Sequence, residues 1–335
     1  MREKVIVRSA KLALILIFWD WSNVLAQPLS TTAHKRQCKP IARVLNNNDR
    51  HWTGGSLLCE SDRLDPEPGK KVEVFCYANG TVLRLGNGTD WDRCVSMRKQ
   101  QVRQAQCTYG NRLNCPKVKG PGEQRNTPAL IAPESSTLLN QKPNFSWYSV
   151  AGATSYLVQV SGVGVNWEEE VKDTHLSYPH EQPGMQFGNA YKITIIAKQK
   201  GYAIKASVAA VNLLPQHDAK QVIGIVKQIN NLGIPKDEAA FLDLDRVYMA
   251  KNLLHETIET LKSQVKAGSR NPTLYRVLGD RYLEAGLPEK AKHEYITATT
   301  LAKRVDNSAE LAKAQAGLQR ITLYSQLPTR INGDQ

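Results

Sequence analysis

The sequence predicts a multi-domain β + α protein: a small disulfide-rich β domain, then a β-sandwich, then α-helical hairpins. Three observations support this fold class. All six cysteines fall between residues 38 and 115. Short runs of alternating apolar residues, separated by turn residues about every ten positions, then continue up to residue 215. Beyond Pro215 the apolar residues repeat with the period of a helix, roughly 3.6 residues.

Changes in residue pattern also set the expected domain boundaries. A stretch rich in Pro, Gly and charge, without an apolar period, is typical of a linker. The expected segments are a signal peptide at 1–26, a disulfide-rich β domain at 33–115, a linker at 116–133, a β-sandwich at 134–215, a helical domain at 216–327 and a flexible tail at 328–335.

The N-terminus has the features of a secretory signal peptide. Basic residues precede an apolar run, Leu12–Trp19, and Val24-Leu25-Ala26 provides a cleavage site before Gln27. The run is far shorter than the roughly 20 residues that cross a bilayer. We therefore expect export to the periplasm or the extracellular space, with no membrane span after cleavage. Retention of the segment as an uncleaved anchor stays open as the alternative.

The cysteine pattern indicates disulfides. An even number of cysteines, confined to one segment of an exported chain, is typical of a disulfide-bonded domain. Zinc is the alternative, but a zinc site needs cysteines about two to four residues apart, and the closest pair here is Cys107 and Cys115. We expect three disulfides, whose pairing the sequence leaves open, among Cys38, Cys59, Cys76, Cys94, Cys107 and Cys115.

A β-hairpin is predicted inside the cysteine-rich domain. Asn79-Gly80 lies between two alternating runs, Val72–Tyr77 and Thr81–Leu85. Together with the preceding "SLLCESDRLDPEPG", the segment Ile41–Gly88 resembles the small β domain of FecR-type bacterial envelope regulators. Ser61-Asp62 stands where that family has Gly-Asp, and the cysteines are additional. The resemblance implies a β domain in a protein of the bacterial envelope.

A strongly basic stretch follows. The whole chain has a formal net charge of +13, and residues 97–125 contain seven Lys or Arg against one acid, Glu123. A solvated helix with a linker is the simplest interpretation, and contact with an anionic envelope polymer is the functional one. A nucleic-acid partner is not expected, because the chain is exported and Tyr109 alone could stack on a base. The candidate basic patch is Arg98, Lys99, Arg103, Arg112, Lys117 and Lys119.

The next segment has the strand pattern of a sandwich. Apolar residues alternate along Tyr156–Val160 and again along Tyr191–Ile195. The segment resembles a fibronectin type III or other immunoglobulin-like domain. The resemblance implies that Trp147 is the buried core tryptophan and that the hydroxyl of Tyr191 bonds back to the corner at Pro183-Gly184.

Residues 271–304 predict one helix-turn-helix. Tyr275, Leu278 and Tyr282 form an apolar face, and Gly286-Leu287-Pro288 separates the two helices. Gly279, in mid-helix, costs about 1 kcal/mol relative to alanine, so we expect a second helix to pass close to it. The residues of the repeat core are Tyr275, Leu278, Gly279, Tyr282, Gly286, Ala291, Tyr295 and Ala298. Their spacing resembles a tetratricopeptide (TPR) repeat, which implies a binding or scaffolding module without catalytic groups.

A degenerate copy of this unit precedes it. Leu244 and Tyr248 lie 34 residues before Leu278 and Tyr282, while Asp245 replaces the glycine. A final amphipathic helix, with apolar residues from Leu311 to Ile321, would cap the stack. If the family geometry holds, the concave groove for a partner displays Thr273, Arg276, Asp280, Leu283, Arg246 and Met249.

We find no residue combination typical of catalysis, cofactor binding or metal binding. The seven histidines are scattered, and His255-Glu256 lacks the second histidine of a zinc motif. Ser96–Lys99 and Ser263–Lys266 match Ser-x-x-Lys without the companion motifs of penicillin-binding enzymes. We therefore expect no enzyme activity, no catalytic residue, no cofactor and no metal.

The expected function is that of an exported, non-catalytic adaptor or scaffold of the bacterial cell envelope. Its partner would be a peptide or a helix in the short TPR groove. Binding of peptidoglycan or polysaccharide through the basic residues of 97–125 is the alternative, and an enzyme in the β domain is a third, weaker hypothesis.

Overall fold

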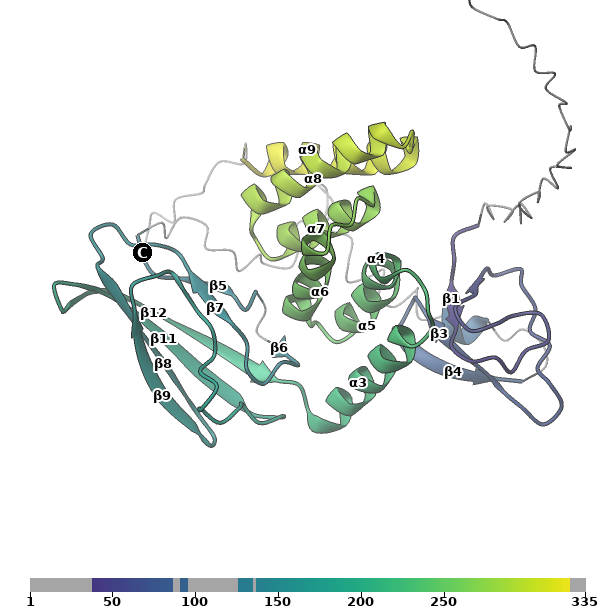
Figure 1. The fold of residues 1–335 in the computed structure, drawn as a ribbon, viewed down its shortest axis with the longest axis horizontal. Helices are drawn as coiled ribbons and strands as arrows, with labels where there is room; N and C mark the ends of the chain where they lie inside the picture. The colour runs from purple at the N-terminus through teal and green to yellow at the C-terminus, as the bar shows by residue number, and fades with distance from the viewer. Residues whose placement is uncertain (1–37, 87–90, 96–125, 135–136, 326–335) are drawn as a thin grey trace, which may run out of the picture. The chain divides into compact units, whose positions relative to one another are not determined.

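In the computed structural model, β-sheets are followed by helices (Figure 1). The structure describes residues 38–86, 91–95, 126–134 and 137–325. All of these except Cys38 belong to one unit, Lys39–Gln335. The signal peptide, the basic patch, most of the expected linker and the expected tail lie outside the described residues, as do Cys107 and Cys115.

The N-terminal module contains a four-stranded antiparallel sheet with the order β2-β1-β3-β4. The predicted hairpin is confirmed: Val72 pairs with Leu85 and Cys76 pairs with Thr81. A small apolar core on one side of the sheet contains Leu58, Val74 and Trp91. The strands are β1 Ala42–Val44, β2 Leu57–Leu58, β3 Val72–Cys76 and β4 Thr81–Leu85.

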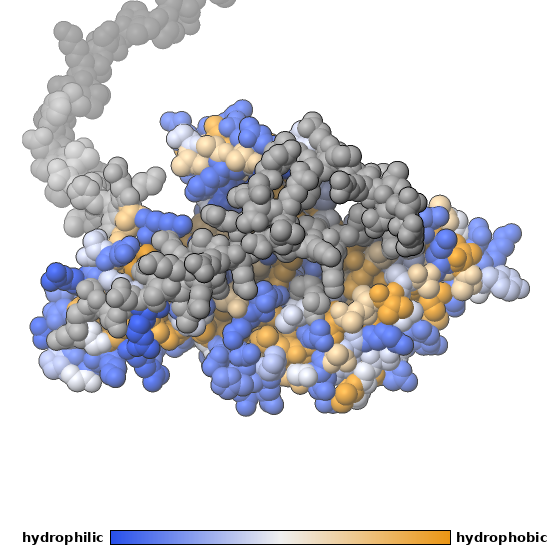
Figure 2. Space-filling model, turned by 180° about the vertical axis from the view of Figure 1, so that it is seen from behind, coloured by the Kyte–Doolittle hydropathy of each residue, from blue (hydrophilic) through white to orange (hydrophobic). Residues whose placement is uncertain are grey.

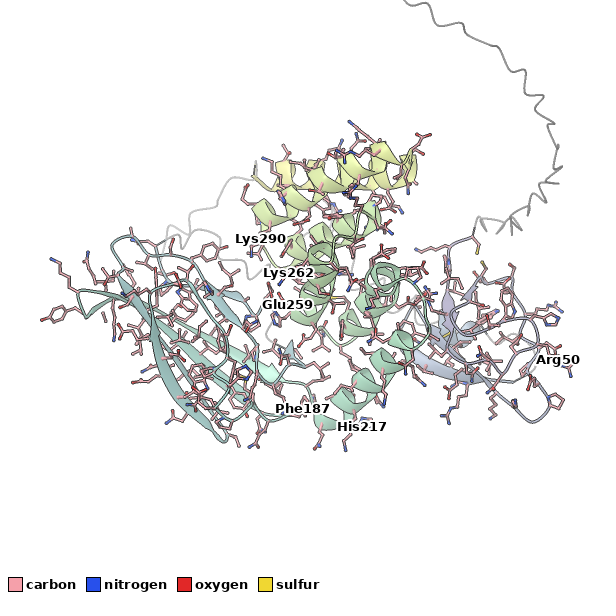
Figure 3. The ribbon with its side chains drawn as sticks, viewed as in Figure 1. Arg50, Phe187, His217, Glu259, Lys262 and Lys290 are labelled. Carbon is pink, nitrogen blue, oxygen red and sulfur yellow. A yellow bond between two sulfur atoms is a disulfide. The ribbon has the colours of Figure 1, made fainter. Side chains whose placement is uncertain are left out.

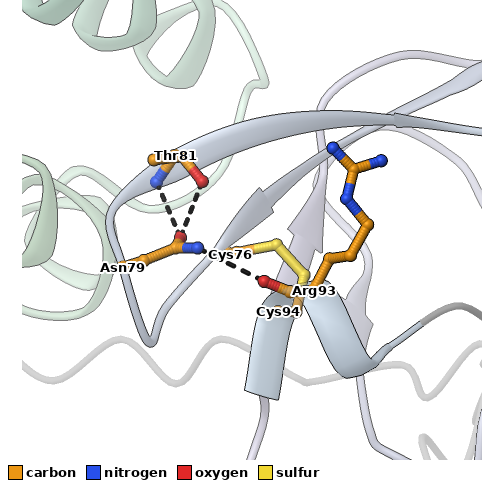
Figure 4. Close-up of a disulfide and its surroundings, with 5 residues drawn as sticks. All are labelled: Cys76, Asn79, Thr81, Arg93 and Cys94. Carbon is orange, nitrogen blue, oxygen red and sulfur yellow. Dashed lines mark hydrogen bonds between the residues drawn. A yellow bond between two sulfur atoms is a disulfide. The ribbon is translucent and has the colours of Figure 1, made fainter. Parts of the chain in front are cut away.

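Disulfides reinforce this module. Cys76 at the end of β3 is bonded to Cys94 in the short helix α1, Asp92–Val95 (Figure 4). Next to the disulfide, the side-chain oxygen of Asn79 accepts hydrogen bonds from the amide and the hydroxyl of Thr81, which closes the hairpin turn. Cys38 and Cys59 are disulfide-bonded as well. The expectation of disulfides is therefore confirmed for the cysteines of the described region.

Residues 130–213 form two sheets around one apolar core. One sheet has the order β10-β7-β5 and the other β6-β12-β11-β8-β9. Strand β5 lies within the stretch expected to be a linker, because Leu130-Ile131-Ala132 is itself a short apolar run that pairs with β7. The strands are β5 Leu130–Ala132, β6 Thr137–Leu138, β7 Phe145–Trp147, β8 Ser155–Gly162, β9 Val165–Val171, β10 His175–Leu176, β11 Ala190–Gln199 and β12 Tyr202–Leu213.

Two tyrosines tie down the loop that precedes β11. Trp147 is buried in the core, as predicted, with 2% of its surface exposed. The hydroxyl of Tyr191 accepts a hydrogen bond from the amide of Gln186 at 2.7 Å. It donates to the Val163 carbonyl at 3.0 Å and not to the expected corner at Pro183-Gly184, where the Pro183 carbonyl accepts from the Tyr178 hydroxyl at 2.7 Å.

The C-terminal region is helical and fits TPR-like repeats. The predicted turn at 286–288 separates two helices. Within the part of the chain that the structure describes, no helix is long and apolar enough to cross a membrane. The helices are α3 Gln216–Asn230, α4 Lys236–Glu238, the π-helical η2 Ala239–Leu244, α5 Asp245–Met249, α6 Leu254–Lys266, α7 Pro272–Glu284, α8 Pro288–Arg304 and α9 Ser308–Ser325.

Helices α7, α8 and α9 meet around the ring of Tyr295, which is fully buried. A Cβ on Gly279 of α7 would lie 2.8 Å from this ring, and a Cβ on Gly317 of α9 would lie 2.5 Å from it. The predicted close approach of a second helix at Gly279 is thus confirmed, and Gly317 supplies a second gap that we did not predict. Ala291 and Ala298 of the repeat core are also buried.

Helix α3 is the apolar meeting point of the three modules. Its residues Val222 and Ile229 pack in one cluster with Phe75 of the N-terminal sheet and Leu244 of η2. Phe187 and Leu139 of the two-sheet module pack against the same cluster. Leu244 therefore contacts α3 in the way that Leu278 contacts α6, which is the arrangement expected when helical hairpins stack.

A buried ion cluster joins β1 to the helices. Arg43 is 1% exposed, and its guanidinium donates hydrogen bonds to Asp243 at 2.8 Å, to Glu238 at 2.7 Å and to the Gly55 carbonyl at 2.6 Å. The hydroxyl of Tyr77 also donates to Asp243, at 2.7 Å. Burial raises the pKa of the Asp243 carboxyl, and the hydrogen bonds from Arg43 and Tyr77 act in the opposite direction.

The glycines around Tyr295 provide a first test. We expect Gly279→Ala and Gly317→Ala each to lower the stability of the helical region by about 1–3 kcal/mol, because the added methyl group overlaps the Tyr295 ring. Gly224→Ala in α3 is the matched control: nothing lies within 4 Å of its Cβ, so the better helix propensity should stabilise by up to about 1 kcal/mol. Urea unfolding followed by helical circular dichroism measures all three; a change of the same sign in all of them would contradict the packing argument.

The ion cluster provides a second test. We expect Arg43→Met to destabilise the protein by about 3–5 kcal/mol, since it leaves the buried carboxylate of Asp243 without its cation. The control is Arg84→Ala, which removes an exposed ion pair with Glu73 and should cost no more than about 1 kcal/mol. Thermal and urea unfolding of both variants give the comparison. Equal losses for the two would show that the buried cluster does not hold the modules together.

Candidate protein-binding cleft

A cleft of about 410 Å³ lies between α7 and α9. Two of the predicted groove residues, Arg276 and Asp280, lie in its wall on successive turns of α7. The other wall is α9, which the sequence predicted only as a cap. Its contributions to the cleft are Lys313, Ala316, Gln319 and Arg320.

Ion pairs across the cleft hold α7 and α9 in place. Arg276 donates to Glu310 of α9 at 2.6 Å and to Asp280, one turn along its own helix, at 2.7 Å. Asp280 also accepts from Arg320 of α9 at 2.9 Å and from the hydroxyl of Tyr295 at 2.6 Å. The Asp280 carboxylate therefore accepts hydrogen bonds from side chains of three helices. Its position follows from the packing of Tyr295.

The cleft presents cations to solvent. Lys313 and Arg320 have side chains that are 58% and 54% exposed, whereas Glu310 is 9% exposed and Arg276 16%. Lys313 pairs with Glu310 at 2.7 Å and Arg320 with Asp280 at 2.9 Å, and with Arg276 the cleft has three cations against two acids. Exposed guanidinium and ammonium groups can donate charge-assisted hydrogen bonds to carboxylates of a partner. The arrangement can recognise an acidic or carboxylate-bearing segment.

The other predicted groove residues have contacts within the chain. Arg246 donates to the Tyr77 carbonyl at 3.2 Å and its guanidinium lies 5.3 Å from the Tyr77 ring centre, so the N-terminal hairpin covers it. Met249 and Leu283 pack against the apolar cluster of α6 to α8. Thr273 is half-buried at the start of α7, where its backbone amide donates a hydrogen bond to the side-chain oxygen of Asn271.

Sequence reasoning missed the residue that links the two repeats. Asp245, at the position of the expected glycine, receives two hydrogen bonds from Arg281 of α7 at 2.7 and 2.8 Å. Arg281 also bonds to Glu284 at 2.7 Å. The departure from the repeat pattern at Asp245 was visible in the sequence; the bidentate partner was not, because it lies 36 residues away.

One group of side chains in the described region could hold a metal ion. The ligand atoms of Glu134, His255 and Glu259 all lie within 4.8 Å of one another. His255 and Glu134 are a buried pair whose Nδ1 and Oε2 atoms are 2.6 Å apart. Burial lowers the pKa of His255, but the hydrogen bond and charge of Glu134, together with the charges of Glu256 and Glu259, outweigh it, so the pKa lies above its ordinary value.

Neighbouring lysines favour an ion-pair network over a metal site at this group. Lys262 donates to Glu259 at 2.5 Å, and Lys290 of α8 interacts electrostatically with both residues (Figure 3). Burial lowers the pKa of Lys290, and the Glu134 charge acts against this. Two ammonium groups next to the carboxylates already neutralise much of the charge that would attract a cation. The group joins the segment after β5 to α6.

The exposed large apolar side chains of the described region are spread over several elements. On the face in Figure 2, apolar and hydrophilic residues of the described region are mixed. The exposed large apolar side chains come from separate elements: Val163 after β8, Tyr202 and Val208 on β12, Ile223 on α3, Ile296 on α8 and Val305 after it. Apolar residues scattered in this way are normal for a protein surface.

The comparisons with known proteins give a limited result. No protein-family model matches the chain, and no curated protein matches it. Among solved structures, the crystal structure of PcrH from Pseudomonas aeruginosa aligns with 19% sequence identity and a TM-score of 0.27. That alignment covers 32% of this chain and 83% of PcrH.

Glu310 gives the cleft a measurable pH dependence. Burial acts to raise its pKa, but hydrogen bonds from Lys313 and Arg276 hold the pKa below the ordinary value. A depressed folded-state pKa contributes stability above the unfolded pKa, about 4.3, and loses it as the pH falls through the folded value. We expect the loss of stability on acidification below about pH 5 to be smaller in Glu310→Gln than in the wild type.

Urea unfolding of both proteins at a series of acidic pH values measures this difference. Glu259→Gln, which removes an exposed glutamate paired with a lysine one turn along the same helix, is the control. If Glu310→Gln followed the wild-type curve in parallel, the ion pairs of the cleft would not be coupled to folding.

Proposed function

We propose that this chain is an exported, non-catalytic adaptor or scaffold of the bacterial cell envelope, which binds an acidic peptide or helix of a partner protein in the α7–α9 cleft. The observation that carries the proposal is the charge arrangement of the cleft. Lys313 and Arg320 are exposed and pair with Glu310 and Asp280, and Arg276 leaves the cleft with one positive charge in excess.

The covering of the first helical hairpin supports this location. The N-terminal hairpin packs on α5, where a Cβ on Gly80 would come within 2.4 Å of Ala250, and Tyr77 covers Arg246. The two-sheet module also bonds to this hairpin: Glu256 of α6 accepts hydrogen bonds from the backbone amides of Leu139 and Asn140. Within the described residues, the chain's own β modules thus cover the first hairpin, whereas α7 and α9 keep a cleft that a partner could enter.

Two further features support an adaptor outside the cytoplasm. Disulfides such as Cys76–Cys94 persist in oxidising compartments and are rare in the cytosol. In the described region, the buried Arg43 is paired with Asp243 and the buried Glu310 with Arg276. The disulfide fits an oxidising compartment, and the paired charges fit structural roles in a binding protein.

The test is capture of partners from envelope extract by the full chain. We expect the double charge reversal Lys313→Glu with Arg320→Glu to reduce recovery of the bound protein by about tenfold or more, since two exposed cations become repulsive. Lys292→Glu, an exposed position on α8 outside the cleft, is the matched control with an unchanged yield.

Equal recovery with the double variant would contradict the proposal. Retention of both proteins on peptidoglycan or polysaccharide, abolished by salt, would instead favour the anionic polymer as the ligand of the basic residues 98–119.

A further inference from the structure

A second and larger groove, of about 660 Å³, lies between the N-terminal sheet and α3. One wall is the hairpin, with Thr81, Val82 and Arg84 of β4. Helix α3 forms the opposite wall, and Val247 and Ala250 close the bottom. The groove shares no residue with the α7–α9 cleft, and nothing in the proposed function uses it.

Among the described residues, strand β4 is an edge of its sheet, and the hydrogen-bond register shows which of its backbone groups are not used within that sheet. The amide of Tyr77 donates to the Ile41 carbonyl, and the carbonyl of Glu73 accepts from the Leu45 amide. Ile41 and Leu45 flank β1, so these groups of the β3 segment face β1. The alternate residues of β3, such as Val74, must therefore bond to β4. This assigns Leu83 to the pairing with β3, so the amides and carbonyls of Val82 and Arg84 are directed away from the sheet.

The facing side of α3 leaves room for another segment. Gly224, in the middle of this helix, lines the groove, and nothing lies within 4 Å of a Cβ built on it. A glycine there carries a helix-propensity cost of about 1 kcal/mol, and no close packing in the described region requires it. Ile225 on the next position provides apolar surface, and Gln221 and Gln228 provide side-chain amides.

The charges around the groove favour an acidic occupant. Lys220 is exposed, and Arg84 is 74% exposed. Glu73, the acid among the groove residues, is already bonded to Arg84 at 2.8 Å and to Gln228 at 3.2 Å. A second copy of this edge would bring Arg84 and Lys220 against their own counterparts, and like charges in apposition oppose such a pairing.

We propose that an extended acidic segment of a partner protein binds in this groove as an additional strand on β4, with its side chains against α3. The free amides and carbonyls of Val82 and Arg84 supply main-chain hydrogen bonds, which give affinity without reading sequence. Alternate side chains of the segment face α3. There Ile225 contacts apolar groups, and the Lys220 ammonium donates to carboxylates. An edge strand beside a helix is the geometry in which peptides are bound by strand addition.

The ligand can be identified by selection on the full chain. A display library of random peptides of about eight residues, close to the usual strand length, should yield peptides in which acidic and apolar residues alternate. The selected peptide, labelled with fluorescein, is then titrated against the variants below. Failure to enrich such peptides would overturn the proposal.

Two matched pairs of variants test the mode of binding. Arg84→Pro and Arg84→Ala both lose the ion pair with Glu73, but proline also removes the amide on the free edge, a position where edge strands tolerate proline. We expect Arg84→Pro to bind the selected peptide about tenfold more weakly than Arg84→Ala, the effect of about one lost hydrogen bond. Equal affinities would overturn strand addition.

The second pair tests the place of binding. Nothing lies within 4 Å of a Cβ on Gly224, so the side chain of Gly224→Leu can extend into the groove; we expect it to weaken peptide binding by at least about tenfold, with an unfolding temperature no lower than that of the wild type. Ile223→Leu, one position away and outside the groove, should bind as the wild type does. Unchanged binding by Gly224→Leu would overturn the location. Binding should also be indifferent to Lys313→Glu with Arg320→Glu, which separates this result from that of the α7–α9 cleft.

Discussion

The arrangement of the modules depends on the buried guanidinium of Arg43. It connects β1 to Glu238 and Asp243, near the start of the helical hairpins, across 200 residues of sequence. A buried cation is costly unless each of its donors finds an acceptor, and Arg43 finds two carboxylates and a carbonyl. Asp243 in turn needs Arg43 and the hydroxyl of Tyr77. These bonds form in one arrangement of the sheet on the helices, and a displaced arrangement would leave buried charges unpaired.

This docking has two consequences for binding. The N-terminal hairpin covers Arg246 on the first helical hairpin, and the last helices keep an open, cation-rich cleft. The same docking brings the free edge of β4 opposite α3 and so creates the larger groove. One buried ion cluster therefore covers Arg246, which we expected to face a partner, and forms the groove in which we propose that a partner strand binds.

Much of the fold could be predicted because its signals are local. The hairpin at Asn79-Gly80 and the gap required by Gly279 follow from turn chemistry and helix packing within one short segment. For the candidate cleft, the sequence placed Arg276 and Asp280 on one helix face. It did not predict α9 as the second wall, nor Gly317 as the counterpart of Gly279. Helices α7 and α9 are both positioned by the ring of Tyr295 on α8, which no local pattern reveals.

The sequence by itself determined the order of the modules, the hairpins, the helical repeat spacing and the confinement of cysteines to the N-terminal third. These are properties of neighbouring residues, for which period and turn propensity suffice. Only the tertiary structure decided which surfaces remain open. The pairs Arg43–Asp243, Arg281–Asp245 and Arg276–Glu310 join residues 200, 36 and 34 positions apart. No local pattern distinguishes such charges from solvated ones, because their partners are selected by burial.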